Sequence, residues 1–175
     1  PDSLKLDCVV AIEENFDFLG PEYADFFNLH RGTIFQSPLW MHLVHRRLAP
    51  GLSARQYTIT FRRPLDRTLL AVLPTVVQRA GALSILQPAD FGVCDYNCII
   101  GDRIVLEALA ADRAVATRLG QIVRDADVFL FRKIRSDGFD PALLLRGSRT
   151  SACENASFAI DVGDDFENWQ RRTMR

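Results

Sequence analysis

The sequence predicts a single α/β domain, and three observations support this class. Two adjoining segments, residues 53–63 and 68–79, have the residue patterns of β-strands. Residues 105–125 carry apolar side chains at a period of 3.6, which is typical of an amphipathic helix. The chain has 175 residues, of which 48% are hydrophobic, so it is long enough to enclose one sizeable core.

The two strands form the centre of the predicted domain. Apolar and polar residues alternate over 57–61, which predicts one buried face and one solvent-facing face. Residues 69–77 are almost continuously apolar, which indicates a strand covered on both faces. The short link at 64–67 predicts an antiparallel hairpin. Pro74 cannot donate a backbone hydrogen bond, so it marks either a place where the sheet opens or a bulge or strand end without function.

Two helices are predicted before the hairpin, after a first strand at residues 6–12. The first helix begins at Pro21, because proline is favoured in the first turn. Its buried side is expected to consist of Tyr23, Phe26 and Phe27.

The second helix begins at Ser37 and Pro38, a hydroxyl cap followed by a residue that needs no backbone donor there. It ends at residues 50–51, which are proline and glycine. His42 and His45 are expected on its solvent side. The side chains expected on its apolar face are Trp40, Leu43, Val44 and Leu48.

The remaining elements follow from short apolar runs and turn residues. Gly81 turns the chain into a strand at 83–86, and polar residues lead into a short strand at 99–100. After the helix at 105–125 we expect a strand at 128–134 buried on both faces, a short helix at 139–145 and a last strand at 157–162. Asp164, with Glu167 after it, resembles a capping box. We therefore expect one domain over residues 1–163, and residues 164–175 as the start of a helix of a second domain.

Composition excludes several classes of function. The net charge is −1, so no overall field attracts nucleic acid or an anionic membrane. No apolar run reaches the roughly 18 residues of a membrane span, and the first residues lack a signal-peptide pattern. Cys94 and Cys98 have no second cysteine pair or nearby histidine in the sequence, so no metal site is predicted. Free buried thiols indicate a reducing compartment, and we expect a cytoplasmic protein.

Common catalytic motifs are absent from the sequence, including GxSxG, the phosphate-binding P-loop, HExxH and GxGxxG. The polar groups of most interest are Gln36 and Ser37 beside Trp40, which either contact a ligand or serve only at a helix start. Asp95 and Tyr96 lie where a loop meets a strand, a common position for ligand contacts. A structural hydrogen bond from Tyr96 is the alternative.

Three local signatures carry a family resemblance. They are residues 35–40 (FQSPLW), residues 70–74 (LAVLP) and residues 95–97 (DYN). In this order they resemble the acetyltransferase-like proteins of bacterial cellulose and exopolysaccharide biosynthesis. These belong to the GNAT superfamily and are related to the Fem-type transferases, which carry two GNAT-like domains in tandem. The resemblance spans nearly the whole chain.

The resemblance implies a mixed, mostly antiparallel sheet flanked by helices. It also implies transfer of an acyl group from acetyl-CoA or another acyl-CoA to an amine or hydroxyl of a small-molecule or saccharide acceptor. The cofactor would lie where the sheet splays, at Leu73, Pro74 and Thr75. The acceptor would contact four residues, Gln36, Ser37, Trp40 and Asn97.

The chemistry of this transfer needs a general base, and Asp95 is the best candidate, with Tyr96 as proton donor. GNAT enzymes bind pyrophosphate at a Q/R-x-x-G-x-G/A turn before a helix, where backbone N–H groups favour an anion. The nearest match, residues 78–83, departs from this pattern at its last position and is expected between two strands. The chain therefore reads as an acyltransferase or its first half.

An alternative reading is a non-catalytic, degenerate GNAT-like module. Such a module would bind an acceptor, or pack against a second GNAT-like domain or another copy of the chain. A surface that packs in this way is expected to expose apolar side chains. A binding protein of unrelated fold is the third reading.

Overall fold

The computed structural model describes residues 6–30, 32–134, 138–145, 147–151 and 165–173. Among these residues it contains helices and two mostly antiparallel sheets, which confirms the mixed α/β class. One sheet has the order β1 (Val9–Glu13), β3 (Thr58–Arg62), β4 (Leu69–Leu73), β7 (Ile100–Gly101). The other has the order β2 (Ala54–Gln56), β5 (Thr75–Ala80), β6 (Leu83–Pro88), β8 (Val128–Phe129).

The predicted hairpin is confirmed, and it connects the two sheets. β3 pairs antiparallel with β4, and β2 pairs antiparallel with β5. Pro74 lies between β4 and β5, where one strand segment ends and the next begins. On the edge of β4 that faces away from β3 the neighbouring strand is β7, whereas on the edge of β5 that faces away from β2 it is β6. The single sheet of the prediction is therefore divided in two at Pro74.

The expected solvent-facing side of β3 is wrong, because all five residues of this strand are buried. Thr60 donates a hydrogen bond to Glu13 on β1, at 2.8 Å. Arg62 forms ion pairs with Glu13 and with Glu22, which lies on the first helix. A polar face can be buried when each polar group finds a partner. The prediction that β4 is covered on both faces is confirmed.

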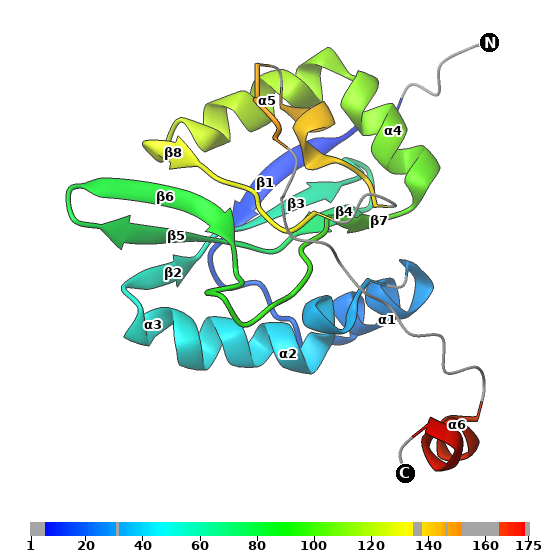
Figure 1. Ribbon diagram of the computed structural model, residues 1–175. Helices are drawn as coiled ribbons and strands as arrows, with labels where there is room; N and C mark the ends of the chain where they lie inside the picture. Colours follow the sequence, from blue (N-terminus) through cyan, green and yellow to red (C-terminus); the bar gives the residue numbers. More distant parts are fainter. Residues whose placement is uncertain (1–5, 31, 135–137, 146, 152–164, 174–175) are drawn as a thin grey trace.

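Helices cover the sheets on both sides (Figure 1). On one side lie α1 (Pro21–His30), α2 (Pro38–Leu43) and α3 (Ala49–Gly51), and on the other lie α4 (Arg103–Ala111) and α5 (Arg113–Val123). The 3₁₀ turn η1 (Ile34–Gln36) precedes α2. The start of α1 at Pro21 and the burial of Tyr23 and Phe26 are confirmed, while β1 begins at Val9 rather than Leu6.

The segment after α2 corrects the prediction for His45. Residues 44–48 form a π-helical turn, η2 (Val44–Leu48), which has more residues per turn than an α-helix. The buried side of this segment therefore differs from the one that a period of 3.6 predicts. His45 is only 5% exposed, and Leu48, expected on the apolar face, is 39% exposed. Ser37 is the N-cap residue of α2, but its hydroxyl makes no capping hydrogen bond.

The predicted helix over 105–125 is two helices. The break falls at Asp112, whose backbone is extended and whose carboxylate accepts a hydrogen bond from Ala114 N at 2.7 Å. Leu109 and Val115 are buried on either side of the break. Because the apolar pattern continues through the break, the period alone does not reveal it.

The predicted strand at 128–134 is shorter than expected. Only β8 pairs with β6, in parallel, and Ile134 forms an isolated parallel bridge with Asn97. Phe129 at the end of β8 and Phe131 after it are half-buried, and Leu130 is 38% exposed, so the expected burial on both faces is wrong. The short helix expected at 139–145 is the 3₁₀ turn η3 (Pro141–Leu144).

The last predicted elements are only partly within the described residues. The strand expected at 157–162 and the cap Asp164 lie outside them. The helix α6 (Phe166–Thr173) is present, and Asp165 accepts a hydrogen bond from Asn168 N at 2.9 Å at its start. Across the described ranges, none of the helices has the length and apolar character that crossing a membrane requires.

Candidate functional site

The segment 89–99, between β6 and β7, brings the predicted site residues together. It begins beside the strand break, where Ala89 N donates a hydrogen bond to Pro74 O at 3.2 Å. Phe91 and Gly92 have positive φ angles of 43° and 85°, which turns the chain sharply away from β6. The segment then returns to the sheet at β7, which pairs with β4.

Asp90 is the buried anchor of this segment and is only 2% exposed. Its carboxylate accepts hydrogen bonds from Gly92 N and from Asn97 Nδ2, both at 2.8 Å. Lys133 Nζ lies 3.9 Å from the same carboxylate and also donates to Cys94 O. A buried carboxylate needs such partners, because an isolated buried charge is strongly unfavourable.

Asn97 ties the segment to the chain that follows β8. Its Nδ2 donates a second hydrogen bond, to Arg132 O at 3.0 Å, and its backbone N donates to Lys133 O. Within the described part of the chain, its Oδ1 accepts no hydrogen bond. Asn97 is therefore held in place by its side-chain nitrogen Nδ2 and its backbone N, while its side-chain oxygen Oδ1 remains able to accept a hydrogen bond.

Gln36 joins η1 to the same segment and is 2% exposed. Its Nε2 donates to Tyr96 O at 3.1 Å, and its Oε1 accepts from Thr33 Oγ1 and from Cys98 Sγ. Its backbone oxygen accepts from Tyr23 Oη at 2.6 Å. These contacts are structural, so Gln36 positions the segment rather than presenting a free polar group.

Trp40 also contacts the segment, through a hydrogen bond from its Nε1 to Cys94 Sγ at 3.3 Å. Burial raises the pKa of the Cys94 thiol, against the smaller opposing effect of the Trp40 hydrogen bond. Cys94 is therefore a protonated, structural thiol at neutral pH. The aromatic ring of Phe35 packs between Trp40 and Tyr96, with centroid distances of 5.6 and 6.3 Å.

The predicted catalytic pair lies at the surface of this cluster. Asp95 is exposed and Tyr96 is half-buried. Leu73, Pro74 and Thr75 are buried in the sheet, and the Thr75 hydroxyl donates to Tyr57 O. The structure thus brings residues 36, 40 and 95–97 together beside the strand break, and their catalytic and binding roles stay predictions.

A cavity of about 410 Å³ lies next to this cluster. Asn97 and Cys98 line it from the segment 89–99, and Arg103 lines it from the start of α4. Arg103 Nε donates to Glu107 at 2.6 Å, and its guanidinium lies 5.9 Å from the ring centroid of Phe139. The other polar lining comes from His30 and Thr33. The polar side chains that line this cavity are neutral or cationic, which suits a ligand that carries hydroxyl groups.

The N-terminus of α4 is closed to an anion by the chain itself. Asp102 Oδ1 accepts hydrogen bonds from Ile104 N at 2.8 Å and from Val105 N at 3.2 Å. Its negative charge occupies the position where a phosphate would meet free N–H groups and the helix dipole. The other pyrophosphate candidate, residues 78–83, lies in the β5–β6 hairpin, as predicted, and not before a helix.

Sequence reasoning missed Asp90 and Lys133 as partners in this cluster. Asp90 lies two residues after Pro88 and two before Gly92, so the sequence around it has the composition of an ordinary turn. Lys133 meets it only through the parallel course of β6 and β8, which no local pattern reveals. Among the described residues, no group of three or more histidine, cysteine, aspartate or glutamate side chains is placed to hold a metal ion.

Comparisons with known proteins add no relative. No family model, no curated protein and no solved structure gives a significant match to this chain. The function is therefore argued from the residues and their geometry.

Proposed function

We propose that this chain is an acyltransferase-type module that binds an acceptor molecule and does not itself bind acyl-CoA. The observation that carries this proposal is the carboxylate of Asp102, which accepts hydrogen bonds from Ile104 N and Val105 N at the start of α4. In the superfamily that the sequence resembles, free N–H groups at a helix start would hold the pyrophosphate, and at the start of α4 two of these groups are bonded to Asp102. A second anion at this position would be repelled and would find two N–H groups already used.

The sheet arrangement supports a transferase-type framework. β6 and β8 are parallel neighbours, and the helices α4 and α5 connect them, whereas the other named strand pairs are antiparallel. This is a mixed, mostly antiparallel arrangement with a helical crossover, of the kind that the family resemblance implies. The division at Pro74 lies beside the cluster of predicted site residues.

The acceptor would bind in the 410 Å³ cavity next to Asn97. This volume lies within the range of about 300–1,000 Å³ that is usual for small-molecule sites. The Asn97 carbonyl oxygen can accept a hydrogen bond from a ligand hydroxyl or amine, and Arg103 can donate one. We infer an acceptor of the size of a monosaccharide or an amino sugar.

Exposed apolar side chains support the related proposal that a second domain or another copy of the chain packs on this module. Ile34 in η1 is 69% exposed, and Leu39 in α2 is 61% exposed. Leu43, 44% exposed, lies one turn after Leu39 on the same side of the helix. Large apolar residues exposed on one helix side are typical of a contact surface.

A second candidate function is acyl transfer by this chain itself, with Asp95 as general base and Tyr96 as proton donor. It is favoured by the position of these residues directly before Asn97, which lines the cavity. Unlike the first proposal, it requires saturable binding of acyl-CoA.

Calorimetric titration with acetyl-CoA separates the two candidates. We expect no saturable heat at about 1 mM cofactor, a concentration at which even a weak specific site is occupied. Saturable binding of acetyl-CoA would overturn the first proposal and favour the second.

A spectroscopic titration tests the acceptor site separately. We expect glucose or glucosamine to shift the ¹H–¹⁵N resonances of Asn97 and Cys98 in the folded protein. Arg103→Gln should weaken this binding severalfold. Arg113 is an exposed arginine of α5 that does not line the cavity, so Arg113→Gln should leave the binding unchanged. If neither sugar shifts these resonances, acceptor binding in this cavity is wrong.

A further inference from the structure

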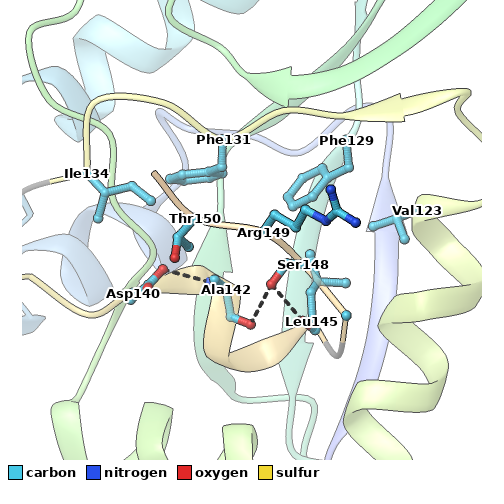
Figure 2. A pocket seen from close by; sticks show the side chains of 11 residues that line it. Val123, Phe129, Phe131, Ile134, Asp140, Ala142, Leu145, Ser148, Arg149 and Thr150 are labelled. Atoms are coloured by element: carbon cyan, nitrogen blue, oxygen red, sulfur yellow. Dashed lines mark hydrogen bonds between the residues drawn. The ribbon is translucent and has the colours of Figure 1, made fainter. Parts of the chain in front are cut away.

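A second cavity lies beside β8 and the segment that follows it (Figure 2). It has a volume of about 260 Å³. Phe129 lines it from β8, Phe131 from the segment that follows, and Val123 from the end of α5. The lining is completed by Ile134, Asp140, Ala142, Leu145 and residues 147–150. The cavity shares only Ile134 with the cavity next to Asn97, so it is a separate site.

The polar groups of this pocket are mostly used by the fold. Asp140 Oδ1 accepts a hydrogen bond from Ala142 N at 2.9 Å, and Asp140 is the N-cap residue of η3. Ser148 Oγ donates to Ala142 O at 3.2 Å and lies 2.9 Å from Leu145 O. Figure 2 shows these bonds along the wall of the pocket that η3 forms.

Arg149 differs from these groups, because its guanidinium has no ion-pair or hydrogen-bond partner among the residues that the structure describes. Figure 2 shows it directed between Phe129 and Val123, at the opposite end of the pocket from Asp140. An apolar pocket with one unpaired cation at its edge is complementary to an apolar group that carries one negative charge. The planar guanidinium matches a carboxylate in particular, since it can donate two parallel hydrogen bonds.

The volume limits the size of the ligand. At about 30 Å³ per water molecule, the pocket holds the equivalent of roughly nine waters. It lies slightly below the range of about 300–1,000 Å³ that is usual for drug-sized ligands. This space accommodates a single aromatic ring with one substituent, but not a nucleotide or a disaccharide.

We propose that this pocket binds a small aromatic or branched aliphatic monocarboxylate, with the carboxylate at Arg149 and the apolar group between Phe129, Phe131 and Leu145. The Asp140 carboxylate at the far end disfavours a ligand with a second negative charge there. This proposal is independent of the acceptor site and of acyl-CoA, since it uses other residues.

The first test is a titration of the whole chain with sodium benzoate, followed by ¹H–¹⁵N spectra. We expect a dissociation constant of about 0.1–1 mM, typical of a ligand this small, and shifts at residues 129–131 and 147–150. Benzamide, which has the same shape without the charge, should bind at least about tenfold more weakly. Terephthalate, which adds a second carboxylate opposite the first, should also bind more weakly than benzoate.

Variants of the arginine decide whether the charge acts as proposed. Arg149 is exposed, so Arg149→Gln should fold normally and weaken benzoate binding at least about tenfold. Arg124→Gln removes another exposed charge, near the end of α5 but outside the pocket lining, and should change nothing. The proposal is overturned by unsaturable binding, by equal affinity for benzoate and benzamide, by unchanged affinity in Arg149→Gln, or by shifts confined to the cavity at Asn97.

Discussion

The two helical layers of this protein cover the sheet with different chemistry. Under α4 and α5 the interface is apolar, with Phe61, Leu109 and Leu119 fully buried among other hydrophobic side chains. Under α1 and η2 the aromatic core is accompanied by buried polar groups, including Arg62 and His45. An apolar interface needs only complementary shape, whereas each polar group must also find a partner.

The comparison shows how one sheet can serve two purposes. The apolar layer gives stability that changes little with pH, because it contains few titratable groups. The layer that contains Arg62 depends on named hydrogen bonds and ion pairs, and the predicted site cluster around Gln36 belongs to the same side of the molecule. Changes to single polar groups there should therefore have effects that the other layer does not show.

The largest expected effect comes from Arg62, whose side chain is only 8% exposed. Its guanidinium donates hydrogen bonds to Glu13, to Glu22 and to Arg67 O. We expect Arg62→Ala to lower the free energy of unfolding by about 2–3 kcal/mol, because it leaves Glu13 without its cation in a partly buried site. Urea denaturation followed by circular dichroism measures this change.

The neighbouring arginine provides the matched control. Arg63 pairs with Asp66 at 3.0 Å, but both side chains are about half exposed. Arg63→Ala should therefore cost less than about 0.5 kcal/mol, as exposed ion pairs contribute little. Equal effects of the two substitutions would contradict the difference between a buried and an exposed ion pair.

The second prediction concerns pH, and it depends on His45. This side chain is stacked on Phe18 at 4.8 Å, and neither ring nitrogen has a hydrogen-bond partner among the residues that the structure describes. Burial, and to a smaller extent the charge of Arg46, lowers the pKa of His45 to about 3. The unfolded chain binds this proton near its ordinary pKa of 6.5, so the folded state loses stability as the pH falls below 6.5.

The substitution His45→Phe keeps a ring in this position and removes the titration. Between pH 7 and pH 5 the wild type should lose about 2 kcal/mol more stability than the variant, at about 1.4 kcal/mol per pKa unit. Thermal or urea unfolding at several pH values measures the difference between the two curves. Parallel curves over this range would show that His45 is not buried in its neutral form.

Local patterns in the sequence predict much of the fold. Pro21 marks the start of α1, the apolar run over 69–77 predicts the buried central strand, and the link at 64–67 predicts the hairpin. Each of these features depends on neighbouring residues alone. Neighbouring residues do not reveal the π-helical turn that buries His45 or the break at Asp112, because the apolar period continues through both.

The site shows the same limit. The sequence alone shows Gln36, Trp40 and Asn97 as polar or aromatic residues at helix and strand ends, and the structure brings their segments together. The contact between Asp90 and Lys133 depends on the pairing of β6 with β8, which is a long-range feature. The pocket in Figure 2 is formed by side chains of separate segments, so no sequence pattern indicates it.

The smallest expected effect compares the helix starts of the two layers. Asp102 caps α4 with two hydrogen bonds, whereas the Ser37 hydroxyl makes none at the start of α2. Asp102→Ala should therefore lower the free energy of unfolding by about 1 kcal/mol, and Ser37→Ala by only a few tenths. Urea denaturation of both variants measures the difference. An equal loss in both would mean that Ser37 contributes as much as a bonded cap, and the assignment of Asp102 as the group that occupies the α4 N-terminus would lose its energetic support.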